Sequence, residues 1–202
     1  MVKEFLSKDH QNLDEQVALN LPYRNLLGCL AFLVTRTRPD IMYAVNVLSQ
    51  YQQNPLMDHW KSLVKLFNYV LDTESLGLDL ARARKFRLSC YSDAAHAQCL
   101  NDRKSIIGNI IFLDNVPVNW RTAKQKCVAT SSMESEYIAL VEAAKEILWF
   151  TRICREVSNL DIQFDESLLF CDNTAAIDFA NSPIENKRTR HIDINFQSDG
   201  AE

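Results

Sequence analysis

The sequence predicts an α/β fold in which a mixed sheet is flanked by helices and preceded by a small helical region. Two features of the 202 residues predict it. Apolar side chains recur at helical spacing through the first 80 residues, whereas short apolar or alternating runs typical of strands begin near residue 85. Three such runs, a long helical pattern, a fourth run and a short helical pattern follow in order. This succession favours one mixed sheet with helices packed on it.

Three helices are expected in the first region, which we bound at residues 1 to 80. Residues 22 to 35 start with a proline and carry leucines at mixed helical spacing. A second helix starts at Pro39, and residues 59 to 71 repeat apolar side chains at i, i+3 and i+4. The basic segment at residues 81 to 85 is the expected junction with the second region.

The second region is expected to span residues 85 to 197, with 198 to 202 as a tail. Its expected elements are strands at 86–91, 106–113 and 116–120, a long helix at 132–158, a strand at 168–171 and a short helix at 174–180. The long helix would bury an apolar stripe that runs from Tyr137 to Leu148.

Composition excludes several classes of function. The chain is 47% hydrophobic and 24% charged, as in ordinary soluble globular proteins, and its net charge of -4 argues against a general binder of polyanions. Its six cysteines include no Cys-x-x-Cys pair, which favours reduced core thiols over a zinc knuckle or a redox pair. No apolar run approaches the roughly 20 residues of a membrane span, so we expect an intracellular protein without a membrane partner.

Three carboxylates are the candidate reactive groups. Asp93 and Asp172 follow apolar runs that are expected to be strands, and Glu136 lies at the start of the long helix. Carboxylates that converge on one point repel each other unless divalent cations lie between them. The three therefore predict a metal-dependent site for phosphoryl transfer.

Glu134 and Glu136 need to be told apart. Ser131 and Glu134 have the Ser-x-x-Glu spacing of a capping box, in which the glutamate folds back onto the first amide of the helix. The two glutamates lie about 200° apart around the helix axis. We therefore expect Glu134 to cap the helix and Glu136 to be the metal ligand, with simple solvation at the surface as the alternative for Glu136.

Five motifs in order carry a resemblance to a known family. They are Tyr91-Ser92-Asp93-Ala94, Asp102-Arg103-Lys104-Ser105, the Thr130 to Tyr137 segment, Cys171-Asp172-Asn173, and Arg188-Thr189-Arg190-His191-Ile192-Asp193. Together they resemble the ribonuclease H region of copia-type retrotransposon polyproteins. Motifs within residues 22 to 60 resemble the end of the reverse transcriptase and its connection in the same family, so the resemblance covers most of residues 20 to 196.

The resemblance implies a ribonuclease H-like fold that cuts the RNA strand of an RNA/DNA hybrid. Two Mg²⁺ ions, with Mn²⁺ as a substitute, would share the carboxylates: Asp93 would bridge them, while Glu136 and Asp172 complete their coordination. The implied partners are the hybrid and the rest of a retrotransposon reverse transcriptase. The implied location is the cytoplasm, in a virus-like particle, or the nucleus.

Contacts to the nucleic acid are expected from basic and polar side chains around this site. The candidates are Arg103, Lys104, Ser105, Arg121, Lys124, Asn173, Arg188, Arg190 and His191. For each basic residue an ordinary solvated surface is the alternative. Asn173 has a second role open to it, as the cap of the helix that follows.

The sequence also departs from the family pattern. Family members usually read Asp-Ala-Asp-Trp-Ala where this chain has Asp93-Ala94-Ala95-His96-Ala97. In the family a fifth strand and a final helix with a fourth metal-binding aspartate follow the His-Ile-Asp segment, whereas this chain stops at Glu202. We therefore expect an incomplete domain. Asp193 belongs to the His-Ile-Asp motif and is kept only as the less favoured substitute for the missing group. The alternative function is an impaired or inactive remnant that binds only nucleic acid or a partner.

Overall fold

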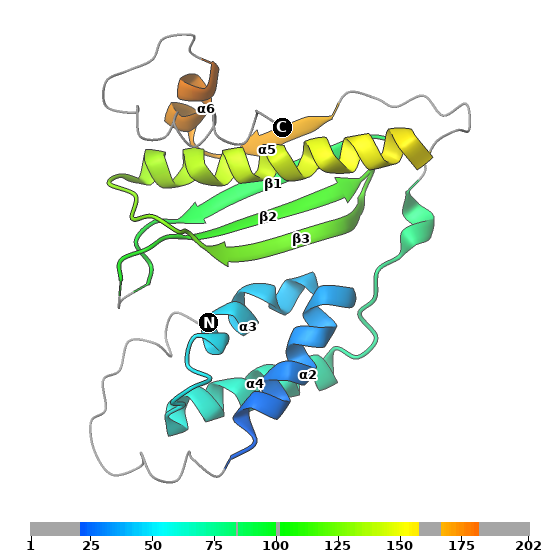
Figure 1. Ribbon diagram of the computed structural model, residues 1–202. Helices are drawn as coiled ribbons and strands as arrows, with labels where there is room; N and C mark the ends of the chain where they lie inside the picture. The colour runs from blue at the N-terminus through cyan, green and yellow to red at the C-terminus, as the bar shows by residue number, and fades with distance from the viewer. Residues whose placement is uncertain (1–20, 84, 100–101, 158–166, 182–202) are drawn as a thin grey trace. The chain divides into compact units, whose positions relative to one another are not determined.

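The chain folds into two compact units, Met1–Leu80 and Ala81–Glu202, each with its own core. The computed structural model describes residues 21–83, 85–99, 102–157 and 167–181 (Figure 1). The division falls at the start of the basic segment that we expected to be the junction, within a short 3-10 turn at Leu80–Arg82. None of the described helices combines the length and the apolar character that crossing a bilayer requires.

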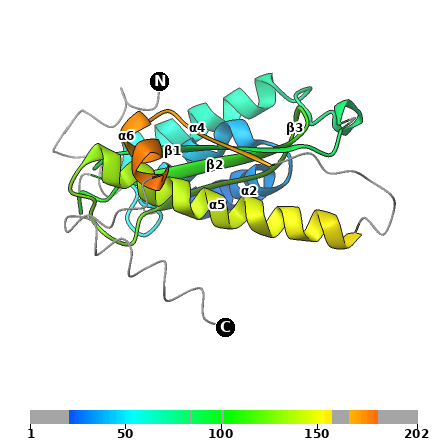
Figure 2. The same ribbon diagram turned by 90° about the horizontal axis from the view of Figure 1, so that it is seen from above.

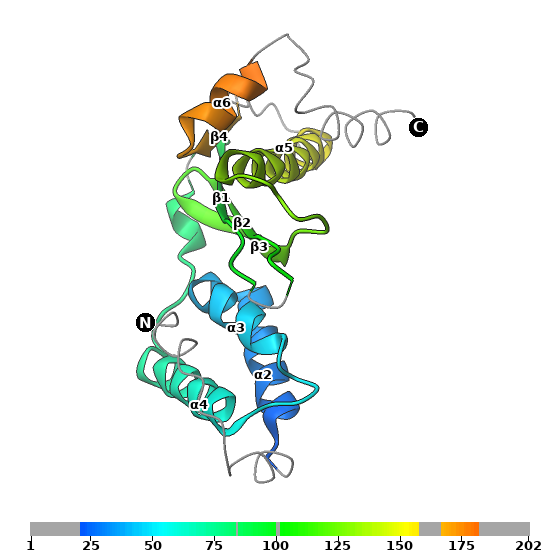
Figure 3. The same cartoon turned by 90° about the vertical axis from the view of Figure 1, so that its left-hand side faces the viewer.

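The first unit is helical, as predicted. Its elements are α2 (Tyr23–Arg36), the 3-10 turn η2 (Pro39–Ile41), α3 (Met42–Ser49) and α4 (Met57–Asp72) (Figure 3). The buried side chains of α2 recur every three or four residues and pack against α3 and α4. Inside this core the hydroxyl of Tyr23 donates a hydrogen bond to the carbonyl of Leu48 at 2.8 Å, which links α2 to α3.

The second unit is a four-stranded mixed sheet with helices. Its elements are β1 (Leu88–Ala95), β2 (Ile106–Leu113), β3 (Val116–Lys124), α5 (Ser132–Val157), β4 (Leu168–Cys171) and α6 (Thr174–Asn181). The strand order is β3-β2-β1-β4, in which β1, β2 and β3 pair antiparallel and β4 pairs parallel to β1. This is a mixed sheet flanked by helices, so the predicted α/β fold class is confirmed.

Strand register brings two of the predicted site residues side by side. In the parallel pairing of β1 with β4, Ser92 lies opposite Cys171. Asp93 and Asp172 are the residues that directly follow Ser92 and Cys171 in the sequence. The strand β1 runs to Ala95, because its last residues still pair with β2, so Asp93 lies inside the strand and not beyond its end. The predicted end at residue 91 was therefore wrong.

Helix α5 lies along one face of the sheet (Figures 1 and 2). Its side chains Ala143 and Ile147 pack with Leu88, Cys90 and Ile111 of the strands. Leu148, expected on the same stripe, is 68% exposed. One residue turns the helix by about 100°, which carries Leu148 out of the row that Ala143 and Ile147 form.

Several predictions concern residues outside the described ranges. The nucleic-acid candidates Arg188, Arg190 and His191 lie there, as do the substitute ligand Asp193 and the tail at 198–202. The fifth strand of the family and the expected incompleteness of the domain also concern this part of the chain. These expectations stay predictions.

Candidate metal centre

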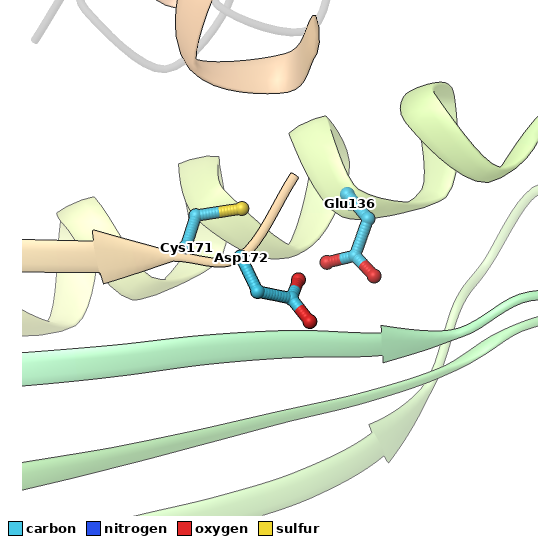
Figure 4. Close-up of side chains that lie close together, drawn as sticks. All are labelled: Glu136, Cys171 and Asp172. Carbon is cyan, nitrogen blue, oxygen red and sulfur yellow. The ribbon is translucent and has the colours of Figure 1, made fainter. Parts of the chain in front are cut away.

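Carboxylates from three elements meet at one end of the sheet. Asp93 belongs to β1, Glu136 to the first turns of α5, and Asp172 follows β4 directly. An oxygen of Glu136, an oxygen of Asp172 and the sulfur of Cys171 all lie within 4.8 Å of one another (Figure 4). Asp93 is outside this closest group, yet its charge acts on Glu136. The structure therefore brings the carboxylates of Glu136 and Asp172 together, with Asp93 near enough for its charge to act on Glu136.

Glu136 is the residue of the group whose ionised carboxylate is most disfavoured by its surroundings. The residue is only 7% exposed, and its Oε2 has no hydrogen-bond partner among the described residues. Burial and, after it, the charges of Asp93 and Asp172 raise the pKa of Glu136 to about 7, against the opposing effect of a hydrogen bond from the backbone of Ala94. A buried carboxylate of this kind needs a proton or a cation.

Glu134, two residues earlier, has a structural role. Its Oε2 accepts hydrogen bonds from the amide of Thr130 at 2.7 Å and from the Thr130 hydroxyl at 2.6 Å. Its own amide donates to the hydroxyl of Ser131 at 3.2 Å. The predicted capping role is present, but the glutamate reaches the amide of Thr130, one residue before the one expected. The threonine hydroxyl supplies a second donor there.

Cys171 is the site residue that sequence reasoning missed, since we expected only core thiols. Side chains alternate along a strand, so Cys171 projects to the opposite face from Phe170 and toward α5, where Glu136 lies. Burial is the main cause that raises the pKa of its thiol, and the carboxylates of Glu136, Asp172 and Asp93 add to it. Its place directly before Asp172 was the available signal.

Two of the predicted cationic contacts are engaged in ion pairs. Lys124 at the end of β3 contacts Asp102 at 2.9 Å and the sulfur of Cys99 at 3.2 Å. The guanidinium of Arg121 lies 3.3 Å from Glu146 and 3.6 Å from Glu142, both on α5. Carboxylates offset part of the charge that either side chain would present to a phosphate.

The three candidate nucleic-acid contacts in the loop between β1 and β2 differ in their exposure. Arg103 is exposed and has a φ of 56°, in the left-handed region, and its amide donates to the carbonyl of Cys99 at 2.8 Å. Lys104 is half-buried. Ser105 has no exposed surface, and its hydroxyl accepts a hydrogen bond from the amide of Ala97 at 3.1 Å. The burial of Ser105 and its hydrogen bond inside the loop argue against a contact of its hydroxyl with nucleic acid, which stays a prediction.

Asn173 takes the capping role that was left open for it. Its Oδ1 accepts a hydrogen bond from the amide of Ala176 at 2.9 Å, in the first turn of α6. The cap fixes the backbone just after Asp172. A contact from Asn173 to nucleic acid stays a prediction.

The donor atoms fit a small divalent cation. Carboxylate oxygens are the ligands that Mg²⁺ and Mn²⁺ take, and the unpartnered Oε2 of Glu136 offers one that is already withdrawn from water. The carboxylates of Asp93 and Asp172 are exposed, so further ligands can reach a bound cation from the solvent side.

Comparisons with known proteins find relatives that match most of the chain. No family model matches the chain. It is 36% identical over 175 residues to the retrovirus-related Pol polyprotein from transposon RE2 of Arabidopsis thaliana and 34% identical over 176 residues to that from transposon TNT 1-94 of Nicotiana tabacum. These alignments cover 86% and 87% of this chain but only 12% and 13% of the polyproteins.

Two further similarities accompany them. The chain is 41% identical over 132 residues to the secreted RxLR effector protein 161 of Plasmopara viticola, which covers 65% of this chain and 93% of that protein. A solved structure of LC11-RNase H1 in complex with an RNA/DNA hybrid aligns with 55% of this chain and 74% of its own, at 13% identity and a TM-score of 0.37. By its identity to the transposon polyproteins over most of its length, this chain belongs to the family of retrovirus-related Pol polyproteins of copia-type transposons.

Proposed function

We propose that the second unit is a ribonuclease H-like domain that hydrolyses the RNA strand of RNA/DNA hybrids with two Mg²⁺ ions, for which Mn²⁺ can substitute. The observation that carries the proposal is the carboxylate of Glu136, which is buried, has one unpartnered oxygen and lies close to the carboxylate of Asp172. Such an arrangement is costly unless a cation satisfies it. Membership of the Pol polyprotein family supports the choice of substrate.

The residues of this chain would hold the cations in the following way. Asp93, on the central strand β1, would contribute to holding both cations, while Glu136 and Asp172 would each contribute to one. Metal ions held by these residues would supply a more acidic water and stabilise the charge that develops on the leaving oxygen. Glu136 binds as a carboxylate and gives its proton to solvent. The Asn173 cap and the pairing of β1 with β4 keep the two aspartates in register.

The hybrid would be held by the exposed cations of the loop between β1 and β2, Arg103 above all. The rest of a reverse transcriptase is a further proposed partner, since the chain spans about an eighth of the polyproteins that it matches. We place the activity in the cytoplasm, in a virus-like particle, or in the nucleus. In support, each of the six cysteines lies in a described range and none forms a disulfide.

The experiment is cleavage of an end-labelled RNA/DNA hybrid by the full 202-residue chain in Mg²⁺. The wild type should cut the RNA strand only, and Asp93→Asn or Asp172→Asn should lose roughly 100-fold or more of the rate, since even groups that only support a metal ligand are worth 10- to 100-fold. Glu134→Gln is the matched control, because it removes a nearby charge outside the cation site. Cleavage that survives Asp93→Asn would refute the proposal.

The same assay addresses the alternative function. A wild type that binds the hybrid without cutting it, in Mg²⁺ and in Mn²⁺, would assign the chain a nucleic-acid-binding role without catalysis. Failure to bind would leave only a protein partner.

A further inference from the structure

We propose that Glu136, Cys171 and Asp172 form a binding site for one thiophilic divalent cation, such as Zn²⁺ or Cd²⁺, and that this cation excludes Mg²⁺ from the carboxylates. The site is distinct in its ligand set from the all-oxygen arrangement proposed above, because it takes the sulfur of Cys171 and leaves Asp93 outside. The binding itself stands on the geometry of this chain. Its inhibitory effect rests on the proposed function.

The distances suit a single ion. The three donor atoms lie within 4.8 Å of one another, and in Figure 4 the sulfur and the two carboxyl groups point toward a shared space. Around a tetrahedral zinc ion, with bonds of about 2.0 to 2.3 Å, neighbouring ligand atoms are about 3.5 Å apart. Each pair therefore needs to close by little more than about 1 Å, which side-chain rotation supplies without moving the backbone.

Burial of Glu136 is the second observation. The residue is 93% buried, and its Oε2 has no hydrogen-bond partner in the described part of the chain. Buried polar atoms without a partner are rare in native proteins and commonly mark an absent ion or water. Glu136, which carries this unpartnered oxygen, is one of the three residues of the cluster that contains the thiol.

The ligand set then selects the kind of cation. Two carboxylates alone suit Mg²⁺ and Mn²⁺, but a thiolate adds a soft ligand that favours Zn²⁺ and Cd²⁺. For mixed sites of this type the affinity rises from Mn²⁺ to Zn²⁺. Three protein ligands leave one tetrahedral position for water, and the nearby charge of Asp93 adds attraction. The thiol proton leaves to solvent as the sulfur binds the ion.

Occupation of this site has a consequence for the proposed function. An ion held by the thiolate engages Glu136 and Asp172, the two residues that would complete the Mg²⁺ coordination. Hybrid cleavage in excess Mg²⁺ should therefore fall when a small amount of Zn²⁺ is added. The loss should be smaller in Cys171→Ser when each protein is compared with itself before zinc.

The binding test is a Cd²⁺ titration of the full chain, followed by the ultraviolet charge-transfer band of cadmium thiolate. The exposed Cys29 and Cys127 are first replaced by serine, since their thiols would add background. In that parent we compare Cys171→Ser with Cys154→Ser, a matched control because both thiols are half-buried. Circular dichroism verifies that each variant is folded.

One equivalent of cadmium should produce the band in the parent and in Cys154→Ser, and no band should form in Cys171→Ser. Glu136→Gln should weaken the binding by about 10-fold or more, as expected for loss of a ligand. Zinc should also raise the melting temperature of the parent but not that of Cys171→Ser. A band that persists in Cys171→Ser, or an unchanged affinity in Glu136→Gln, would overturn the inference.

Failure of this inference and failure of the proposed function are distinguishable. A cadmium thiolate band without any cleavage of the hybrid leaves the thiophilic site standing and removes the ribonuclease. Cleavage in Mg²⁺ without the band does the reverse.

Discussion

The carboxylates of Glu134 and Glu136 lie two residues apart at the start of α5 and have opposite surroundings. One oxygen of Glu134 accepts two hydrogen bonds from Thr130, whereas one oxygen of the buried Glu136 accepts none among the described residues. The first carboxylate stabilises the helix end, and the second costs stability unless a proton or a cation reaches it. This contrast separates structural from functional acidic groups within a single turn.

The contribution of Glu136 to the stability of the metal-free protein should fall as pH rises through the neutral range. The folded pKa of Glu136 is about 7, above its ordinary value of 4.5, with Asp93, Asp172 and Cys171 facing it. At pH values between these two pKa values, the folded state keeps a proton that the unfolded state has released. The free energy of unfolding therefore decreases with pH and levels off above about pH 7. The lowered pKa values of Asp40 and Asp102 act at lower pH.

Urea denaturation in a chelating buffer at about pH 5 and about pH 8 measures this dependence. Glu136→Gln should remove most of the difference between the two values. A wild type and a variant with the same pH dependence would show that Glu136 ionises normally.

Glu134→Ala should destabilise the second unit by about 1 to 2 kcal/mol, because the amide and hydroxyl of Thr130 lose their acceptor. Glu134→Gln should cost less, since a glutamine oxygen still accepts from the amide. Chemical denaturation gives both values. Equal stabilities of wild type and Glu134→Ala would mean that the cap does not hold in solution.

Ser105→Ala should lower the free energy of unfolding by about 1 kcal/mol. The salt dependence of hybrid binding should stay the same. The substitution removes the acceptor for the amide of Ala97 inside the loop and changes no exposed charge. Denaturation and hybrid binding at several salt concentrations test the two parts. A reduced salt dependence would return Ser105 to the nucleic-acid interface.

Arg103→Gln should reduce the salt dependence of hybrid binding more than Arg121→Gln. The guanidinium of Arg121 already lies beside Glu142 and Glu146, whereas Arg103 is exposed on the loop. Loss of one phosphate contact lowers the slope of log affinity against log salt by about 0.9 on a duplex. Fluorescence anisotropy over a range of salt provides the slopes, and a larger effect from Arg121→Gln would reverse the assignment.

The parts of the fold that apolar runs define were predictable from sequence. The runs at Ile106–Leu113 and Leu168–Cys171 became strands with the predicted bounds, since they are rich in the apolar and β-branched residues that favour pairing in a sheet. The end of β1 was not predictable in this way. Its last four residues, from Ser92 to Ala95, are small or polar, and pairing with β2, together with the pairing of Ser92 with Cys171, keeps them extended.

The residues of the site were likewise predictable from the sequence only in part. Asp93, Glu136 and Asp172 could be selected because acidic residues next to apolar runs are conspicuous, and helix geometry separated Glu136 from Glu134. Cys171 could not, because its role depends on which side of β4 faces α5. The engagement of Lys124 by Asp102 and of Arg121 by α5 is likewise a property of the packed structure.

The most direct test of the central claim, that Asp93, Glu136 and Asp172 hold divalent cations together, is a calorimetric Mn²⁺ titration of three proteins: wild type, Glu136→Gln and Glu134→Gln. The two variants remove one charge each, two residues apart on the same helix. We predict that Glu136→Gln binds Mn²⁺ about 10-fold or more weakly and that Glu134→Gln binds like the wild type. Equal affinities in all three proteins would contradict the claim.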